Sequence, residues 1–118
     1  TGDIIDSISF PINTNCTAYD NYLRLLKQSV VLFKKNFKKI INNKYKLKKQ
    51  NIQKGSYFNR KSVDYKSLIN FDKIDNRLST HNKIRSLIFY PFQLPIYNGR
   101  KIKKSLFKNN KIRILYAK

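Results

Sequence analysis

The sequence has very little of several residue types. It contains one cysteine, Cys16, one histidine, His81, and neither methionine nor tryptophan. A single thiol excludes a disulfide within the chain, and one histidine beside one cysteine cannot form a thiol cluster or a multi-histidine site for zinc. The three glycines stand far apart, which excludes a glycine-rich phosphate loop. Uncharged stretches are short and interrupted by Asn, Ser or Pro, so none of them is expected to span a membrane.

Acidic residues are also scarce. The 118 residues hold 6 Asp and Glu against 26 Lys and Arg, which gives a formal net charge of +20. Apolar residues make up 41% of the chain, enough for one small packed domain. The charge fits an anionic partner, such as RNA, a nucleotide diphosphate or an acidic membrane surface. It equally fits a solvated surface, because the lysines are mixed with many Asn and Ile, as in an A/T-rich coding sequence.

The first part of the chain predicts a half-buried strand over residues 4–12. After Ile5 the residues alternate between apolar and polar, so that Ile8, Phe10 and Ile12 share one face. A turn is expected over residues 13–15.

A long helix is predicted over residues 18–41. Thr17 can accept a hydrogen bond from a free backbone N–H at its start, and Asp20 suits the positive end of the helix dipole. Apolar residues then recur at steps of three and four, which places them on one face. They are Tyr19, Leu23, Leu26, Val30, Phe33, Phe37 and Ile40. This stripe predicts core packing, and in an isolated chain it predicts poor solubility or self-association, which gel filtration would detect.

The remainder predicts a polar linker over residues 46–70, a second helix over residues 74–88 and two or three strands. Asp72 is the expected helix cap. The turn signal Tyr97-Asn98-Gly99-Arg100 precedes expected strands at residues 100–103 and 111–116. The inner face of the second helix is expected to carry Ile74, Leu78, His81, Ile84 or Arg85, and Ile88. The fold class is therefore α+β, with domain boundaries expected at 1–45, 46–70 and 71–118.

The residues alone reveal no catalytic apparatus. No Ser or Cys nucleophile has a nearby histidine, and no two carboxylates show a catalytic spacing. His81 is expected to be a packed or capping residue on the apolar side of its helix. Cys16, which precedes a helix cap, is expected to be passive.

Short motifs nevertheless follow one another in a distinctive order. They are Thr1-Gly2-Asp3-Ile4, Phe10-Pro11-Ile12, Thr17-Ala18-Tyr19-Asp20, Lys54-Gly55-Ser56-Tyr57 with Arg60-Lys61 and Asp64, Phe71-Asp72, His81-Asn82-Lys83-Ile84-Arg85, Pro91-Phe92-Gln93-Leu94-Pro95 and Asn98-Gly99. This order resembles the folate-dependent N-formyltransferase family, which includes methionyl-tRNA formyltransferase and the formyltransferases of sugar-nucleotide amines. The resemblance covers nearly the whole chain.

The resemblance implies the C-terminal part of such an enzyme. Residues 1–45 would be the edge of a Rossmann-like catalytic domain, and residues 71–118 a small helix-plus-strands subdomain with an incomplete β-segment. The family's catalytic Asn, His and Asp would lie upstream, the Asp immediately before Thr1, so this chain would contain no catalytic residue. Thr1, Gly2 and Asp3 would border the active site. The cofactor 10-formyltetrahydrofolate would be bound mainly by the missing half, in a cytoplasmic enzyme.

Two acceptor amines fit the resemblance. Only 19 residues follow Gly99, too few for the five-stranded barrel that binds tRNA in methionyl-tRNA enzymes, which favours an amino-sugar nucleotide. The basic charge favours Met-tRNA instead. A third reading, from another class, is a non-catalytic basic module that binds RNA through Lys, Tyr and Phe.

Overall fold

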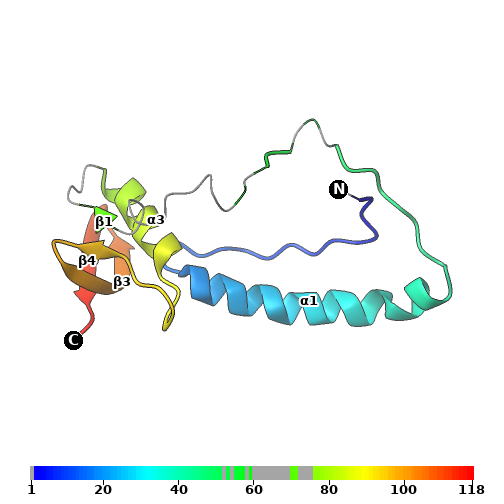
Figure 1. The fold of residues 1–118 in the computed structure, drawn as a ribbon, viewed down its shortest axis with the longest axis horizontal. Helices are drawn as coiled ribbons and strands as arrows, with labels where there is room; N and C mark the ends of the chain where they lie inside the picture. Colours follow the sequence, from blue (N-terminus) through cyan, green and yellow to red (C-terminus); the bar gives the residue numbers. More distant parts are fainter. Residues whose placement is uncertain (1, 52, 54, 58, 60–69, 72–75) are drawn as a thin grey trace.

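The computed structural model describes residues 2–51, 53, 55–57, 59, 70–71 and 76–118. Its elements are α1 (Ala18–Ile41), β1 (Asn70–Phe71), α3 (Arg77–Leu87), β2 (Ile96–Tyr97), β3 (Arg100–Lys108) and β4 (Lys111–Tyr116). The α+β class that the sequence predicts is confirmed. Helix α1 stretches away from a small unit formed by α3 and the strands (Figure 1). The radius of gyration is 18.5 Å, against about 13.5 Å for a compact chain of this length, so the molecule is elongated.

Helix α1 begins where the sequence predicts. The Thr17 hydroxyl accepts a hydrogen bond from the Asp20 N–H at 3.1 Å, and the Asp20 carboxylate accepts one from the Thr17 N–H at 2.8 Å. This reciprocal capping box satisfies two backbone donors that the helix itself leaves free. The bond from the Thr17 backbone also lowers the pKa of the Asp20 carboxyl, which therefore stays charged.

The other end of α1 closes with a sharp reversal of the chain. Asn43 adopts a left-handed conformation with φ 52°. Its N–H donates to the Ile40 carbonyl at 3.1 Å, and the Lys44 N–H donates to the Lys39 carbonyl at 2.8 Å. This pair of bonds is the Schellman arrangement, which asparagine tolerates better than most non-glycine residues. The predicted helix 18–41 is thus confirmed at both ends.

The predicted strand over residues 4–12 is wrong in the described chain. This segment is extended and runs beside α1 in the opposite direction (Figure 1), but only Ile4 is paired, exchanging two 2.9 Å backbone hydrogen bonds with Lys48. Ile8 and Ile12 remain 41% and 60% exposed. The physical reason is that a strand needs a neighbour to bond, and the described residues supply one at Ile4 alone.

The four strands form one sheet in the order β1-β2-β3-β4, with β1 and β2 parallel and the other neighbours antiparallel. Two asparagine-containing loops make the reversals. Asn98 and Gly99 have φ 46° and 72° between β2 and β3, and Asn109 and Asn110 have φ 50° and 54° between β3 and β4. Loops with two positive φ angles match the twist of paired strands. The turn predicted at residues 97–100 is confirmed, and β3 continues past its predicted end at residue 103 as far as Lys108.

Helix α3 begins at Arg77, with the Asn76 side chain accepting a hydrogen bond from the Ser79 N–H at 3.0 Å. The predicted cap, Asp72, and predicted first residue, Ile74, lie outside the described residues. Of the predicted inner face, His81, Ile84 and Ile88 are buried and Arg85 is half-buried.

The core lies between α3 and the sheet. Ile84, Ile88 and Ile102 are almost fully buried and form its centre. Partly buried side chains pack around them, namely Leu94, Tyr97, Ile114 and Tyr116. Leu87 is buried, whereas Leu78, predicted to face inward, is 46% exposed. The predicted inner face is thus confirmed at His81, Ile84 and Ile88 and wrong at Leu78, because contact with the sheet decides which side of the helix is buried.

Candidate functional site

The residues expected to border an active site lie at the start of the N-terminal segment. Thr1 is outside the described residues, and Gly2 and Asp3 are both exposed. A Cβ atom at Gly2 would meet no other atom within 4 Å. The described chain therefore leaves these two residues uncovered.

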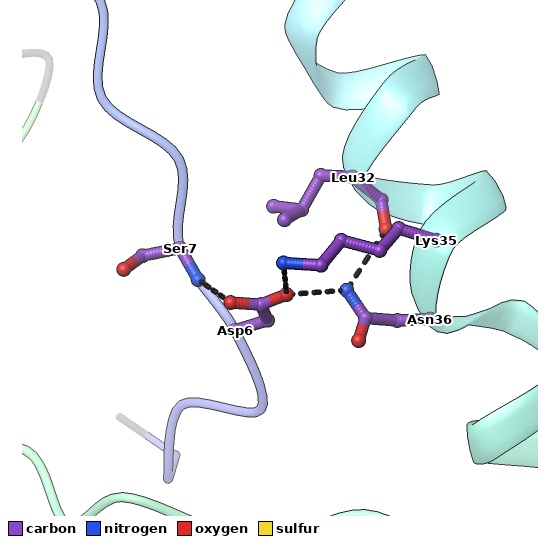
Figure 2. Close-up of polar contacts among 5 residues, drawn as sticks. All are labelled: Asp6, Ser7, Leu32, Lys35 and Asn36. Carbon is purple, nitrogen blue, oxygen red and sulfur yellow. Dashed lines mark hydrogen bonds and ion pairs between the residues drawn. The ribbon is translucent and has the colours of Figure 1, made fainter.

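A polar cluster holds this segment to the last turns of α1 (Figure 2). One oxygen of Asp6 accepts a hydrogen bond from the Asn36 amide at 2.8 Å and lies 3.0 Å from the Lys35 ammonium. The other oxygen accepts from the Ser7 N–H at 2.8 Å. The Asn36 amide also donates to the Leu32 carbonyl at 3.0 Å. At 6% exposure, Asn36 is the buried residue of α1.

The hydrogen bond from Asn36, followed by the contacts with Lys35 and Ser7, lowers the pKa of the Asp6 carboxyl from 3.8 to about 2. Asp6 is thus an anion at neutral pH, and its oxygens are engaged in holding the segment. This assigns it an attachment role rather than that of a general acid or base.

Two hollows flank this cluster. One, of about 260 Å³, is mostly apolar and is lined by Ile5, Asp6, Ser29, Leu32, Phe33, Asn36 and Ile40. The other, of about 350 Å³, lies where the chain reverses after α1 and is lined by Ile5, Asp6, Lys35, Asn36, Lys39, Lys44, Tyr45 and Lys46. The second hollow combines four lysines with one carboxylate, so it favours anions.

His81 connects the start of α1 to the C-terminal unit. The side chain is fully buried, with Nε2 2.8 Å from the Thr14 carbonyl and Nδ1 2.8 Å from the Ser105 hydroxyl. Because a carbonyl oxygen only accepts, Nε2 carries the proton and Nδ1 accepts from Ser105. The ring also stacks on Phe107, with centroids 5.6 Å apart. Both nitrogens are occupied, so the predicted packing role is confirmed.

The loop at residues 13–16 is held by further bonds from α3 and β3. The Arg85 guanidinium donates to the Cys16 carbonyl at 3.0 Å, and the Phe107 N–H donates to the Asn15 side chain at 3.0 Å. The Cys16 thiol is free and half-buried. The loop just before α1 is thereby fixed to the C-terminal unit.

The apolar stripe of α1 is largely uncovered within the described chain; only Tyr19, at its start, is half-buried and packs edge-on against Phe89 with ring centroids 5.4 Å apart. The extended segment contacts a different flank of the helix, through Lys35 and Asn36. Six residues of the stripe are between 38% and 58% exposed, namely Leu23, Leu26, Val30, Phe33, Phe37 and Ile40. A continuous apolar surface of this kind marks an interaction site.

Sequence reasoning missed the attachment role of Asn36 and the gathering of Lys39 with Lys44 and Lys46. The run of asparagines at residues 42 and 43 was the available signal for the second, since Asn is a preferred residue for the left-handed end of a helix.

Over the described residues, the helices are too short or too polar to cross a bilayer.

Solved structures of other proteins are similar to this chain in both sequence and fold. WlaRD, a sugar 3N-formyltransferase solved in the presence of dTDP and 5-N-formyl-THF, is 45% identical, with a TM-score of 0.80 over 92% of this chain and 39% of its own. The N-formyltransferase from Helicobacter canadensis, solved with folinic acid and dTDP-3-aminofucose, is 44% identical, with a TM-score of 0.80 over 92% of this chain and 40% of its own.

A 4-N-formyltransferase from Francisella tularensis shares the fold at 23% identity, with a TM-score of 0.68 over 97% of this chain and 43% of its own. No family model and no curated protein matches the chain. The family that the ordered motifs predict is confirmed: the chain is related to the sugar N-formyltransferases, of whose length it spans about two fifths.

Proposed function

We propose that this chain is part of an enzyme that transfers a formyl group from 10-formyltetrahydrofolate to the amine of an amino-sugar nucleotide in the cytoplasm. The observation that carries the proposal is the identity of 44–45% over 92% of the chain to two sugar N-formyltransferases. One of them was solved with dTDP and a formyl-folate, the other with a dTDP-amino sugar and folinic acid. Methionyl-tRNA is the less favoured acceptor, since these relatives act on sugars.

The exposed stripe of α1 supports an assignment within such an enzyme. We propose that it packs on a Rossmann-like catalytic domain. Thr1, Gly2 and Asp3 would then border the active site, next to a catalytic Asp that precedes Thr1.

The chain's own residues would position rather than react. His81 is buried with both nitrogens bonded, and Asp6 is engaged by three partners, so neither is free to move a proton at a substrate. The folate, when bound, supplies the formyl group as an activated amide. Ile5 offers an apolar surface and the neighbouring lysines offer charge to its carboxylates, so the residues present fit this cofactor.

The test is a formyl-transfer assay on the full-length enzyme that contains this segment. The reactants are 10-formyltetrahydrofolate and a dTDP-3-amino sugar, and mass spectrometry detects a product that has gained one formyl group. Methionyl-tRNA serves as the competing acceptor in a parallel reaction. Formylation of the sugar is the expected result; formylation of tRNA alone, or of neither acceptor, would show that the proposal is wrong.

A matched pair of variants tests the packing of α1. Val30→Asn places an amide in the stripe, where burial without a partner costs about 2 kcal/mol. The control, Lys38→Asn, introduces asparagine at an exposed position of the same helix, where the free energy of unfolding is expected to change by less than about 0.5 kcal/mol. Equal effects on the thermal unfolding of the full-length enzyme would contradict the docking of the stripe.

A further inference from the structure

The hollow at the C-terminal end of α1 is built from three parts of the chain. Helix α1 contributes Lys35 and Lys39, the segment after it contributes Lys44 and Lys46, and the N-terminal segment contributes residues 5 and 6. Two features bring these parts together. The Schellman reversal places Lys44 directly after the last turn, and the bonds between Ile4 and Lys48 fix the returning chain beside the N-terminal segment.

The positive charge of this hollow exceeds what the described chain can neutralise. Half of residues 34–49 are lysine, and none of them is acidic. Asp6 is the carboxylate that lines the hollow, and it is already paired with Lys35 at 3.0 Å. Among the described residues, no carboxylate pairs with Lys39, Lys44 or Lys46. The carbonyl end of α1 stabilises part of this charge, but three further exposed lysines still line this open hollow of about 350 Å³.

Under the proposed function, Asp3 borders the active site, and the hollow then lies one short extended stretch from the reaction centre. Asp3 and Asp6 are three residues apart, which spans about 10 Å in an extended chain. In a folate, the aminobenzoyl-glutamate end and the formyl group lie at different parts of the molecule. The carboxylates of a bound folate would therefore lie at a distance from the reaction centre that holds the formyl group. Intracellular folates carry further γ-linked glutamates on this end, each of which adds one carboxylate.

We propose that Lys39, Lys44 and Lys46 bind the poly-γ-glutamate tail of the formyl-folate cofactor. This rests on the proposed function and deepens it, because it makes the polyglutamylated folate the preferred donor. Ile5 would offer an apolar surface to the aminobenzoyl end, and the three lysines would offer positive charge to the successive carboxylates. Exposed ammonium–carboxylate pairs are individually weak, so three of them together give a preference of about tenfold.

The test measures equilibrium binding rather than turnover. Isothermal titration of the full-length enzyme compares 5-formyltetrahydrofolate with one glutamate and with five. The parent enzyme is expected to bind the pentaglutamate about tenfold more tightly. The triple variant Lys39→Gln, Lys44→Gln, Lys46→Gln is expected to lose this ratio. The control variant Lys108→Gln, Lys111→Gln, Lys118→Gln removes the same charge at the other end of the molecule and is expected to keep it.

Three results would overturn the inference. They are equal binding of both folates by the parent, loss of the ratio in both variants, and a triple variant that loses dTDP affinity while keeping the folate ratio, which would make the hollow a phosphate site. Should the triple variant fail to fold, the parent alone suffices, because the ratio must fall as salt rises. An enzyme that binds neither folate would instead contradict the proposed function.

Discussion

Replacement of His81 by alanine tests whether the buried bonds at the start of α1 stabilise the fold. The substitution removes a fully buried ring and its bonds to Thr14 and Ser105. Loss of a buried aromatic side chain costs about 3 kcal/mol, and the Ser105 hydroxyl, only 2% exposed, adds about 1 kcal/mol when it loses its acceptor. We therefore expect the free energy of unfolding to fall by about 4 kcal/mol.

Urea unfolding followed by far-UV circular dichroism measures this loss. With a slope of about 1.5 kcal/mol per molar urea, the midpoint should fall by roughly 2 to 3 M. His81→Gln places an amide donor near the position of Nε2, so it should retain the Thr14 bond and recover about half of the loss. Ser86→Ala, on an exposed part of the same helix, should change stability by less than about 0.5 kcal/mol.

The reasoning would be refuted if His81→Ala moved the midpoint by less than about 0.5 M. It would also be refuted if His81→Gln were as damaging as alanine, because the Thr14 bond would then contribute nothing. A double-mutant cycle with Ser105→Ala isolates the second bond, and a coupling of about 1 kcal/mol is expected.

Three further changes have defined outcomes. Asn36→Leu should raise the pKa of Asp6 from about 2 toward 3.8, measured by NMR titration of its carboxyl carbon, since the Asn36 amide is the largest cause of the lowering. In the parent, the attachment made by Asp6 is fully present above pH 3.8 and is lost as the pH falls through about 2, so the amide protection of residues 4–8, corrected for the intrinsic exchange rate at each pH, should decrease over that window. Thr17→Ala should cost about 1 kcal/mol in urea unfolding by removing the capping box, and an unchanged midpoint would show that the cap is dispensable. Gly99→Ala should cost about 1 kcal/mol because φ is 72° there although no atom lies within 4 Å of a Cβ, and thermal unfolding measures it.

The elements with local signals could be predicted from the sequence. Thr17 and Asp20 bond to each other, so the start of α1 depends on residues three apart. The turn at Asn98 and Gly99 likewise needs only two residues that accept positive φ. These predictions succeeded because the physical cause lies within one short stretch.

The exposure of Leu78 on α3 and the absence of a strand at residues 4–12 could not be predicted, because both depend on a distant neighbour. Leu78 and Leu87 are equally apolar, and the sheet carrying Ile102 decides which is buried. The alternation of apolar and polar residues around Ile8 predicts a buried face, but no part of the described chain covers this face.

The polar contacts of the site were hidden for a related reason. Asp6 and Asn36 are 30 residues apart, and His81 and Thr14 are 67 apart. A contact between single side chains over such distances leaves no periodic pattern in a sequence. The sequence shows that the lysines of the hollow are close together along the chain. It does not show that they lie around one hollow, because that depends on the chain reversal at Asn43.

The bond between Asn15 and Phe107 sets an order of events during synthesis. Its two residues are 92 positions apart, so at ordinary translation rates the loop before α1 leaves the ribosome roughly 5 to 20 s before its partner strand. The β3–β4 hairpin, joined by two residues, closes in microseconds once it is made. The nascent chain therefore carries a capped α1 before the partners of its loop are made: α3 supplies the bonds to Thr14 and Cys16 first, and β3 supplies the bond to Asn15 later.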